Sequence, residues 1–225
     1  MTDVWSIPFK YLNYSQNDVL QLSLKERHKA EKFVRKKDQR NYLSSHIYLR
    51  KILASYFPSL SPSQLVYKYS QFNKPSLLGK KNFHFNLSHT HSCAYVICSD
   101  EGACGIDVEE KQDFETTDSL CKLIFSSEEL NLYKRFQGEE AKELFYKCWT
   151  LKEAHLKAHG TGLRGTSLTY LSFADMLLAR NIHKGYIRED AIYWSQKVSN
   201  QCYLAFCVLN NDLKNKIKYR GIQEV

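Results

Sequence analysis

The chain has no apolar run near the ~20 residues that a membrane-spanning helix requires. Its first residues also lack the basic segment and apolar core of a secretory signal peptide. There are only four prolines and no low-complexity tract, so we expect no long disordered segment. The seven cysteines include no Cys-x-x-Cys pair, and most have apolar neighbours. They are predicted to be reduced thiols of a cytoplasmic protein, not a disulfide framework or a zinc site.

Acidic residues are fewer than basic ones. The 225 residues carry a formal net charge of +8, and 43% of them are hydrophobic. A chain of this length can bury about 70% of its unfolded surface, so we expect a hydrophobic core that is stable without disulfides or a structural metal. The positive charge favours an anionic partner, such as nucleic acid, a membrane surface, a phosphorylated cofactor or an acidic protein. Composition does not choose among these partners.

Helical and strand patterns occur in both halves of the chain. Capping-box patterns begin helices at Ser23 and Ser126, an apolar stripe after Asp38 predicts another helix, and Gly160 ends the longest helical pattern, 138–159. Strands are expected over residues 65–69, 84–89, 92–98, 103–109, 166–174, 184–188, 191–197 and 202–209. Because strands and helices do not alternate regularly, the pattern favours an α+β fold.

Three carboxylates are concentrated in the segment 105–110. In a strand, Asp107 and Glu109 would share one face, with Ile106 and Val108 on the other. Such a pair of carboxylates repels unless a cation lies between them. The ordinary alternative is a strand that runs out into solvent with its acids facing water.

The longest predicted helix places Trp149, Glu153 and Lys157 on one stripe, because each is four residues from the next. A Glu–Lys pair at this spacing is commonly a surface salt bridge, but tryptophan is uncommon on a solvated stripe. Glu153 would add a third carboxylate to the pair on the strand. Three carboxylates with water and phosphate oxygens are suited to Mg²⁺.

Ser88 and His89 end the strand 84–89, and Lys74 lies in a loop. Each has an ordinary structural interpretation, and each is also a phosphate-binding candidate. His91 adds a second imidazole, but no further histidine or cysteine lies at ligand spacing. Gly-x-Gly-x-x-Gly, a Walker lysine loop and a Gly-x-Ser-x-Gly elbow are all missing from the sequence.

Taken together, these stretches resemble the 4′-phosphopantetheinyl transferases of the Sfp (surfactin-activating) type. The similar segments are 29–33 with Asp38 and Arg50, 73–75, 85–89, 105–109, 149–157 and 160–163. The resemblance runs from about residue 20 to residue 210. One departure is Glu110, where relatives often carry a basic residue.

The resemblance implies a holo-[acyl-carrier-protein] synthase: 4′-phosphopantetheine passes from coenzyme A to a serine of an apo carrier protein, leaving adenosine 3′,5′-bisphosphate. It implies that Asp107, Glu109 and Glu153 bind Mg²⁺, with Mn²⁺ as an alternative. Glu153, or a water that it orients, would be the base, with Asp107 and Lys157 as further catalytic residues. The implied coenzyme A ligands are Lys29, Arg40, Lys74, Asn86, Ser88, His89, Lys152 and Lys157.

The resemblance also implies two similar α/β lobes that form an intramolecular pseudo-dimer, here over residues 1–104 and 105–225, with the metal site in the second. The implied protein is a cytoplasmic monomer that acts on acidic carriers of fatty-acid, polyketide or non-ribosomal peptide synthesis, without nucleic acid or membrane. Two alternatives stay open: a basic nucleic-acid-binding protein that uses residues 25–37 on phosphates, and a metal-dependent nuclease.

Overall fold

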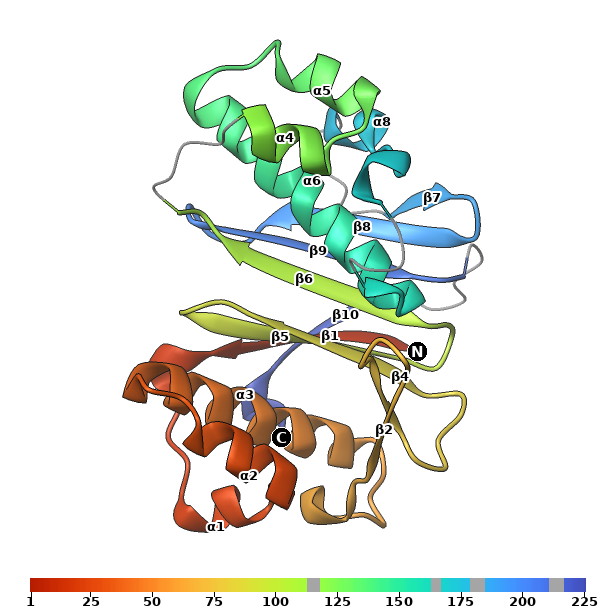
Figure 1. Cartoon of the computed structure of the whole chain (residues 1–225). Coiled ribbons are helices and arrows are strands. Elements are labelled where there is room, and N and C mark those ends of the chain that lie inside the picture. Colours follow the sequence, from red (N-terminus) through yellow and green to blue (C-terminus); the bar gives the residue numbers. More distant parts are fainter. Residues whose placement is uncertain (113–117, 163–166, 179–184, 211–216) are drawn as a thin grey trace.

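Two β-sheets lie next to each other in the middle of the molecule, and the helices of each lie on its outer side (Figure 1). The computed structural model describes residues 1–112, 118–162, 167–178, 185–210 and 217–225. Each sheet and its helices form one lobe with its own hydrophobic core. The predicted α+β class is confirmed.

The first lobe is built on a four-stranded sheet of order β10-β1-β5-β4. Its strands are β1 (Thr2–Pro8), β4 (His84–His89), β5 (Cys93–Ser99) and β10 (Lys218–Gly221), with a separate hairpin of β2 (Tyr67–Tyr69) and β3 (Pro75–Leu77). Its helices are α1 (Gln16–Leu20), α2 (Leu24–Glu31) and α3 (Lys36–Ser55). Strand β10 returns from the end of the chain and pairs parallel to β1, where Arg220 Nε donates to Asp3 Oδ2 at 2.8 Å.

The second lobe is built on an antiparallel sheet of order β6-β9-β8-β7. Its strands are β6 (Cys104–Glu110), β7 (Tyr186–Arg188), β8 (Ala191–Lys197) and β9 (Cys202–Val208). Its helices are α4 (Asp118–Ile124), α5 (Ser127–Tyr133), α6 (Gly138–His159) and α8 (Ala174–Leu178). Short 3-10 turns cover Phe9–Tyr11, Pro62–Gln64, Leu168–Tyr170 and Ile222–Glu224.

Local sequence explains three of the helix ends. The Oγ of Ser23 accepts from the backbone N–H of Glu26, whose carboxylate accepts from the N–H of Ser23 in return, and Ser126 and Glu129 repeat this arrangement. Gly160 ends α6 with a φ of 69°, in the left-handed region that favours glycine. These three predicted ends are confirmed.

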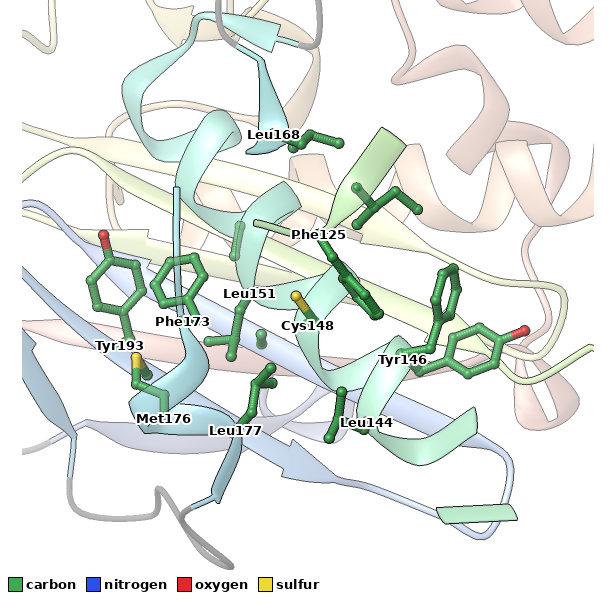
Figure 2. Packing of buried hydrophobic residues seen from close by; sticks show 14 of the residues in the cluster. Phe125, Leu144, Tyr146, Cys148, Leu151, Leu168, Phe173, Met176, Leu177 and Tyr193 are labelled. Carbon is green, nitrogen blue, oxygen red and sulfur yellow. The ribbon is translucent and has the colours of Figure 1, made fainter. Parts of the chain in front are cut away.

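The buried apolar side chains form three clusters, one inside each lobe and one between the two sheets. Figure 2 shows the core of the second lobe, where Leu151 and Cys148 of α6 lie among Phe125, Phe173 and Tyr193. A matching core lies under α3 in the first lobe. A third cluster between the two sheets includes Val4, Ile97, Ile106, Val108, Trp194 and Phe206. The sheets are therefore apolar on both faces, and the lobes are joined by packing as well as by the chain.

One predicted strand is wrong, and several elements were not predicted. The segment 166–174 forms a 3-10 turn that leads into α8, with residue 166 outside the described residues. Its apolar side chains Leu168 and Phe173 are buried against α6 without strand pairing. No elements were assigned to β1, α1, α4 or β10, and α3 begins at Lys36, before the expected Asp38. Among the described residues, no helix has the length and apolarity to cross a bilayer.

Candidate functional site

The acidic strand β6 lies at the edge of its sheet, next to strand β4 of the other lobe. Ile106 and Val108 are buried in the cluster between the sheets. Side chains alternate along a strand, so Asp107 and Glu109 lie on the opposite face, toward α6. The alternation predicted from the sequence is confirmed, and the acids do not run out into solvent, since Asp107 is buried.

Gly105 allows α6 to lie directly on β6. A Cβ at this position would lie 2.1 Å from the carbonyl oxygen of Ala154 and 2.4 Å from the backbone nitrogen of Ala158. No other residue fits without moving the helix backbone. The contact brings the α6 stripe that carries Glu153 and Lys157 next to the carboxylates of the strand.

Asp107 is held by contacts from both lobes. Its Oδ1 accepts from Nζ of Lys157 at 2.6 Å and from Oγ of Ser88, on β4, at 3.0 Å. Its Oδ2 is buried and has no hydrogen-bond partner in the described structure. A buried carboxylate oxygen without a partner is costly, which makes it a ready ligand for a cation.

Burial and neighbouring acids raise the pKa of the other two carboxyl groups, Glu109 and Glu153. Desolvation raises the pKa of Glu153 to about 7, with further increases from Asp107 and Glu109 and a decrease from Lys157. Desolvation and Asp107 likewise raise the pKa of Glu109, while the hydrogen bond from Trp149 lowers it. A carboxyl group with a pKa near neutrality can accept a proton at physiological pH, as a general base must.

The donor set fits a divalent cation of the Mg²⁺ type. Oxygen atoms are the ligands that Mg²⁺ prefers, and both Asp107 Oδ2 and Glu153 Oε1 are buried without a hydrogen-bond partner among the residues that the structure describes. Within the described ranges, however, no three histidine, cysteine or acidic side chains are gathered so that they could hold a metal as they stand. In this arrangement, the ammonium group of Lys157 pairs with Asp107 instead.

The first lobe supplies the cationic side of the site. His89 ends β4, and the pKa of His89 is lowered by desolvation and then by the charges of Lys157 and Lys29. The Nζ of Lys29 lies 5.2 Å from the ring centroid of Tyr42. The ring of His46 packs on that of Tyr42, with centroids 3.9 Å apart and the planes tilted by 30°. Burial lowers the pKa of His46 to about 4; Glu26 opposes this decrease, and the charges of Lys29 and His89 add to it.

Three cavities border these residues. The largest, about 450 Å³, is lined by Lys25, Glu26, Lys29, Tyr42, His46, Leu49, Tyr67, Tyr69, Asn73, Pro75, Phe85, Asn86 and Leu87. One of about 360 Å³ lies between the lobes, lined by Phe33, Asp38, Asn41, Tyr42, His89, Thr90, His91, Glu109, Glu110 and Gln112. One of about 230 Å³ is lined by Glu109, Glu110, Gln112, Leu120, Ile124, Phe145, Tyr146 and Trp149. The two smaller cavities both include Glu109 and Glu110 of the acidic strand, and the largest shares Tyr42 with the cavity between the lobes.

The prediction that Lys152 binds the cofactor is wrong. Its side chain is fully buried, and its ammonium group pairs with Glu129 at 2.5 Å. It also donates to the carbonyl oxygens of Ile124 and Leu168. These partners use all three of its N–H donors, as a fully buried ammonium requires. Lys152 lies on the face of α6 turned away from Glu153, because adjacent residues of a helix do not share a face.

Two other predicted ligands make contacts within the protein. Lys74 Nζ donates to the carbonyl oxygens of Cys104 at 3.1 Å and Ala158 at 2.5 Å, so it ties a loop of the first lobe to the second. Burial lowers the pKa of Lys74. Arg40 is exposed, and its guanidinium donates to the carbonyl oxygen of Leu12 at 2.9 Å. Neither contact was predicted.

Asn86 and Ser88 are buried and directed at the second lobe. The Oδ1 of Asn86 accepts from the backbone N–H of Ile106 at 2.9 Å, and the Oγ of Ser88 accepts from that of Val108 at 3.3 Å. The structure therefore brings Asp107, Glu109, Glu153, Lys157, Ser88 and His89 together across the junction of the lobes. Leu163, part of the resembling segment 160–163, lies outside the described residues.

The sequence did not predict that Tyr42 and His46 line the largest cavity of the first lobe. Tyr42 and His46 lie four residues apart on α3, within the apolar stripe. Their spacing is a signal for one shared face, but a histidine beside apolar positions does not distinguish a cavity wall from a core. Trp149 was singled out, yet its role as donor to Glu109 at 3.0 Å depends on the packing of α6 on β6.

Two family models match the chain in succession. Residues 13–101 match the N-terminal part of 4′-phosphopantetheinyl transferases. Residues 103–207 match the 4′-phosphopantetheinyl transferase superfamily. The two matches meet between β5 and β6, where the chain passes from one lobe to the other.

Curated relatives carry the same name. The 4′-phosphopantetheinyl transferase HetI of Nostoc sp. is 30% identical over 164 residues, 71% of this chain and 69% of HetI. A protein of Synechocystis sp., provisionally named as such a transferase, is 32% identical over 64% of this chain and 59% of its own length. The transferase Sfp of Bacillus subtilis is 28% identical over 63% of this chain and 62% of Sfp. None of these names refers to nucleic acid.

Proposed function

Because this chain belongs to the 4′-phosphopantetheinyl transferase superfamily, we propose that it transfers 4′-phosphopantetheine from coenzyme A to a serine of an apo carrier protein. Adenosine 3′,5′-bisphosphate is the second product. The proposal rests on one observation: the acidic and basic side chains of the site lie close together where the two lobes join. These are Asp107, Glu109, Glu153 and Lys157 of the second lobe and His89 of the first. Within the superfamily, we assign the chain to the type that Sfp represents.

Coenzyme A binds along the first lobe in this proposal. The cavity of about 450 Å³ offers Lys25 and Lys29 to phosphate groups, and His46 with Tyr67 to the adenosine. Desolvation and then the charges of Lys157 and of Lys29, which lines this cavity, lower the pKa of His89, so we assign His89 to the phosphates closest to the reacting bond. An approaching phosphate would raise the pKa of His89 and turn it into a charged donor. Charge-assisted hydrogen bonds of this kind are stronger than neutral ones.

The pantetheine arm is assigned to the second lobe. The cavity of about 230 Å³ beside Glu109 is walled mainly by apolar and aromatic side chains, including Phe145 and Trp149. The arm is uncharged and flexible, so an apolar slot next to the carboxylates suits it better than the cationic cavity on the other side.

Mg²⁺ would be held by Asp107, Glu109 and Glu153, with Mn²⁺ able to take its place. When bound, the ion supplies neutralisation of negative charge on the diphosphate of coenzyme A. The buried, unpartnered oxygens of Asp107 and Glu153 are the structural support for this assignment.

The remaining chemistry needs one base and one cation. Glu153, or a water that it orients, takes the proton of the carrier serine as the serine oxygen forms its bond to the phosphorus atom that bears the pantetheine arm. The bond between this phosphorus atom and the oxygen that bridges the two phosphates breaks. Its electron pair stays on that oxygen, which leaves as part of adenosine 3′,5′-bisphosphate. Lys157, whose ammonium already lies on Asp107 at 2.6 Å, offsets the charge of this leaving group.

We also propose that the chain divides into lobes at 104/105, with β10 returning to the first sheet. We further propose that the protein is a cytoplasmic monomer that acts on acidic carriers.

The proposed activity is tested by mixing the protein with coenzyme A, Mg²⁺ and an apo carrier, and then measuring the mass of the carrier. A gain of one phosphopantetheine is expected, and none with an Asp107→Asn control. If no acyl, polyketide or peptidyl carrier gains this mass, the proposed activity is wrong.

A further inference from the structure

Two side chains of β4 complete the hydrogen bonding of β6 across the lobe junction. Strand β6 is the edge of its sheet and pairs with β9 on one side only. On its other side, the N–H groups of Ile106 and Val108 are buried and donate to Asn86 Oδ1 at 2.9 Å and to Ser88 Oγ at 3.3 Å. The two side chains, two residues apart, replace the missing neighbouring strand.

Without these acceptors, two backbone groups would be buried and unpaired. Buried N–H groups in folded proteins almost always have a partner, and an edge strand that lacks one can slide or twist. The paired amides flank Asp107, one residue on each side. Fixing both amides therefore fixes the backbone from which the Asp107 carboxylate projects.

Ser88 also fixes the carboxylate itself. Its hydroxyl donates to Asp107 Oδ1 at 3.0 Å, and it accepts from Val108 N–H and from Lys157 Nζ at 3.1 Å. A serine hydroxyl has one proton and two lone pairs, so these contacts use its full capacity. The bond turns Oδ1 toward β4 and leaves Oδ2 as the unpartnered oxygen of Asp107.

We infer that Asn86 and Ser88 are positioning residues: they lock β6 to the other lobe and orient Asp107, in addition to any contact with coenzyme A. This inference rests on the proposed function for its effect on turnover, but not for the contacts themselves. It adds a structural role to two residues that the family resemblance implied to be coenzyme A ligands.

The first arm of the test measures amide hydrogen exchange in the protein without ligands. Asn86→Leu keeps a similar volume without an acceptor, so exchange at Ile106 should rise about tenfold or more. Ser88→Ala should do the same at Val108, and Ser88→Thr, which keeps the hydroxyl, should restore protection. Amides of the β8–β9 pair are the internal reference, and Asn41→Ala, which loses an exposed bond to the carbonyl of His91, is the control variant. Unchanged exchange at Ile106 and Val108 would overturn the inference.

The second arm separates positioning from binding. Ser88→Ala should lower kcat and weaken Mn²⁺ binding, measured by calorimetry, by about tenfold each, with recovery of both in Ser88→Thr. A raised KM with normal kcat and normal Mn²⁺ affinity would instead make Ser88 a coenzyme A ligand and sink the inference. If the wild type modifies no carrier while the exchange pattern is as expected, the proposed function fails and the positioning role stands.

Discussion

The indole Nε1 of Trp149 donates to Oε1 of Glu109 at 3.0 Å, from helix α6 to strand β6. The bond lowers the pKa of Glu109, against the desolvation and the charge of Asp107 that raise it. A tryptophan on a charged stripe therefore has a specific partner: its hydrogen bond favours the ionised form of Glu109 and orients the carboxylate. Asp107 is oriented in the same way by Ser88 of the other lobe.

We expect Trp149→Phe to weaken Mn²⁺ binding and lower kcat/KM by roughly tenfold to 150-fold, because one hydrogen bond to a charged group contributes ~1.5–3 kcal/mol. Calorimetry and steady-state kinetics measure the two effects. In a double-mutant cycle with Glu109→Gln, the second substitution should add little. Fully additive losses would show that Trp149 acts on something other than Glu109.

Removing a carboxylate of the proposed metal site should affect turnover more than folding. Asp107→Ala and Glu153→Ala are each expected to lose at least ~100-fold in kcat, the size seen when an electrostatic stabiliser of a transition state is deleted. The thermal midpoint of Glu153→Ala without metal should stay the same or rise, because its repulsion with the other two acids is relieved. The midpoint of Asp107→Ala should fall, because Lys157 and Ser88 lose their partner. Near-normal turnover in Mg²⁺ by either variant would contradict the assignment.

His89→Ala should act through coenzyme A. Losing one charge-assisted hydrogen bond costs ~1.5–3 kcal/mol, which corresponds to an increase of roughly tenfold or more in KM for coenzyme A. The KM for the carrier should change little in the same assay. A shift in the carrier KM alone would place His89 on the docking surface instead.

Salt should discriminate between the two substrates. The basic segment 25–37 adjoins the cavity between the lobes through Phe33, and attraction of an acidic carrier weakens as the Debye length falls from ~10 Å at 0.1 M to ~3 Å at 1 M salt. We expect NaCl to raise the KM for the carrier several-fold more than that for coenzyme A. A carrier KM that stays flat up to high salt would indicate apolar docking.

We expect the free energy of unfolding to decrease as the pH falls, because of His155. Its Nδ1 lies 2.7 Å from the hydroxyl of Tyr193, and burial followed by the charge of His159 lowers the pKa of His155 to about 4. Between pH 6.5 and about 4, the unfolded chain binds a proton here that the folded chain does not. Stability is therefore present above pH 6.5 and lost as the pH falls, by at most about 1.4 kcal/mol per pH unit.

Urea unfolding of the wild type and His155→Gln at several pH values checks this expectation. The variant keeps a polar partner for Tyr193 but has no titrating ring. The difference in free energy of unfolding between the two proteins should shrink as the pH falls from 6.5. A constant difference would mean that another histidine, such as His46, carries the acid sensitivity.

Sequence alone determined what depends on neighbours along the chain. The capping boxes at Ser23 and Ser126 and the glycine at the end of α6 are set by residues within one helical turn. The alternation that puts Asp107 opposite Ile106 follows from the two-residue period of a strand. The stripe of Glu153 and Lys157 follows from the period of the helix. The family resemblance added the expectation that strand and helix meet.

Only the tertiary structure decided what each polar side chain touches. Lys152 and Lys157 are both lysines on one helix, but the first is buried in an ion pair with Glu129 and the second reaches Asp107. Their difference depends on which face of α6 packs on the sheet. Asn86 and Ser88 each bond to a backbone amide 20 residues further along the chain, because two edge strands from different lobes lie together. Such contacts are set by long-range packing, which no local pattern of residues encodes.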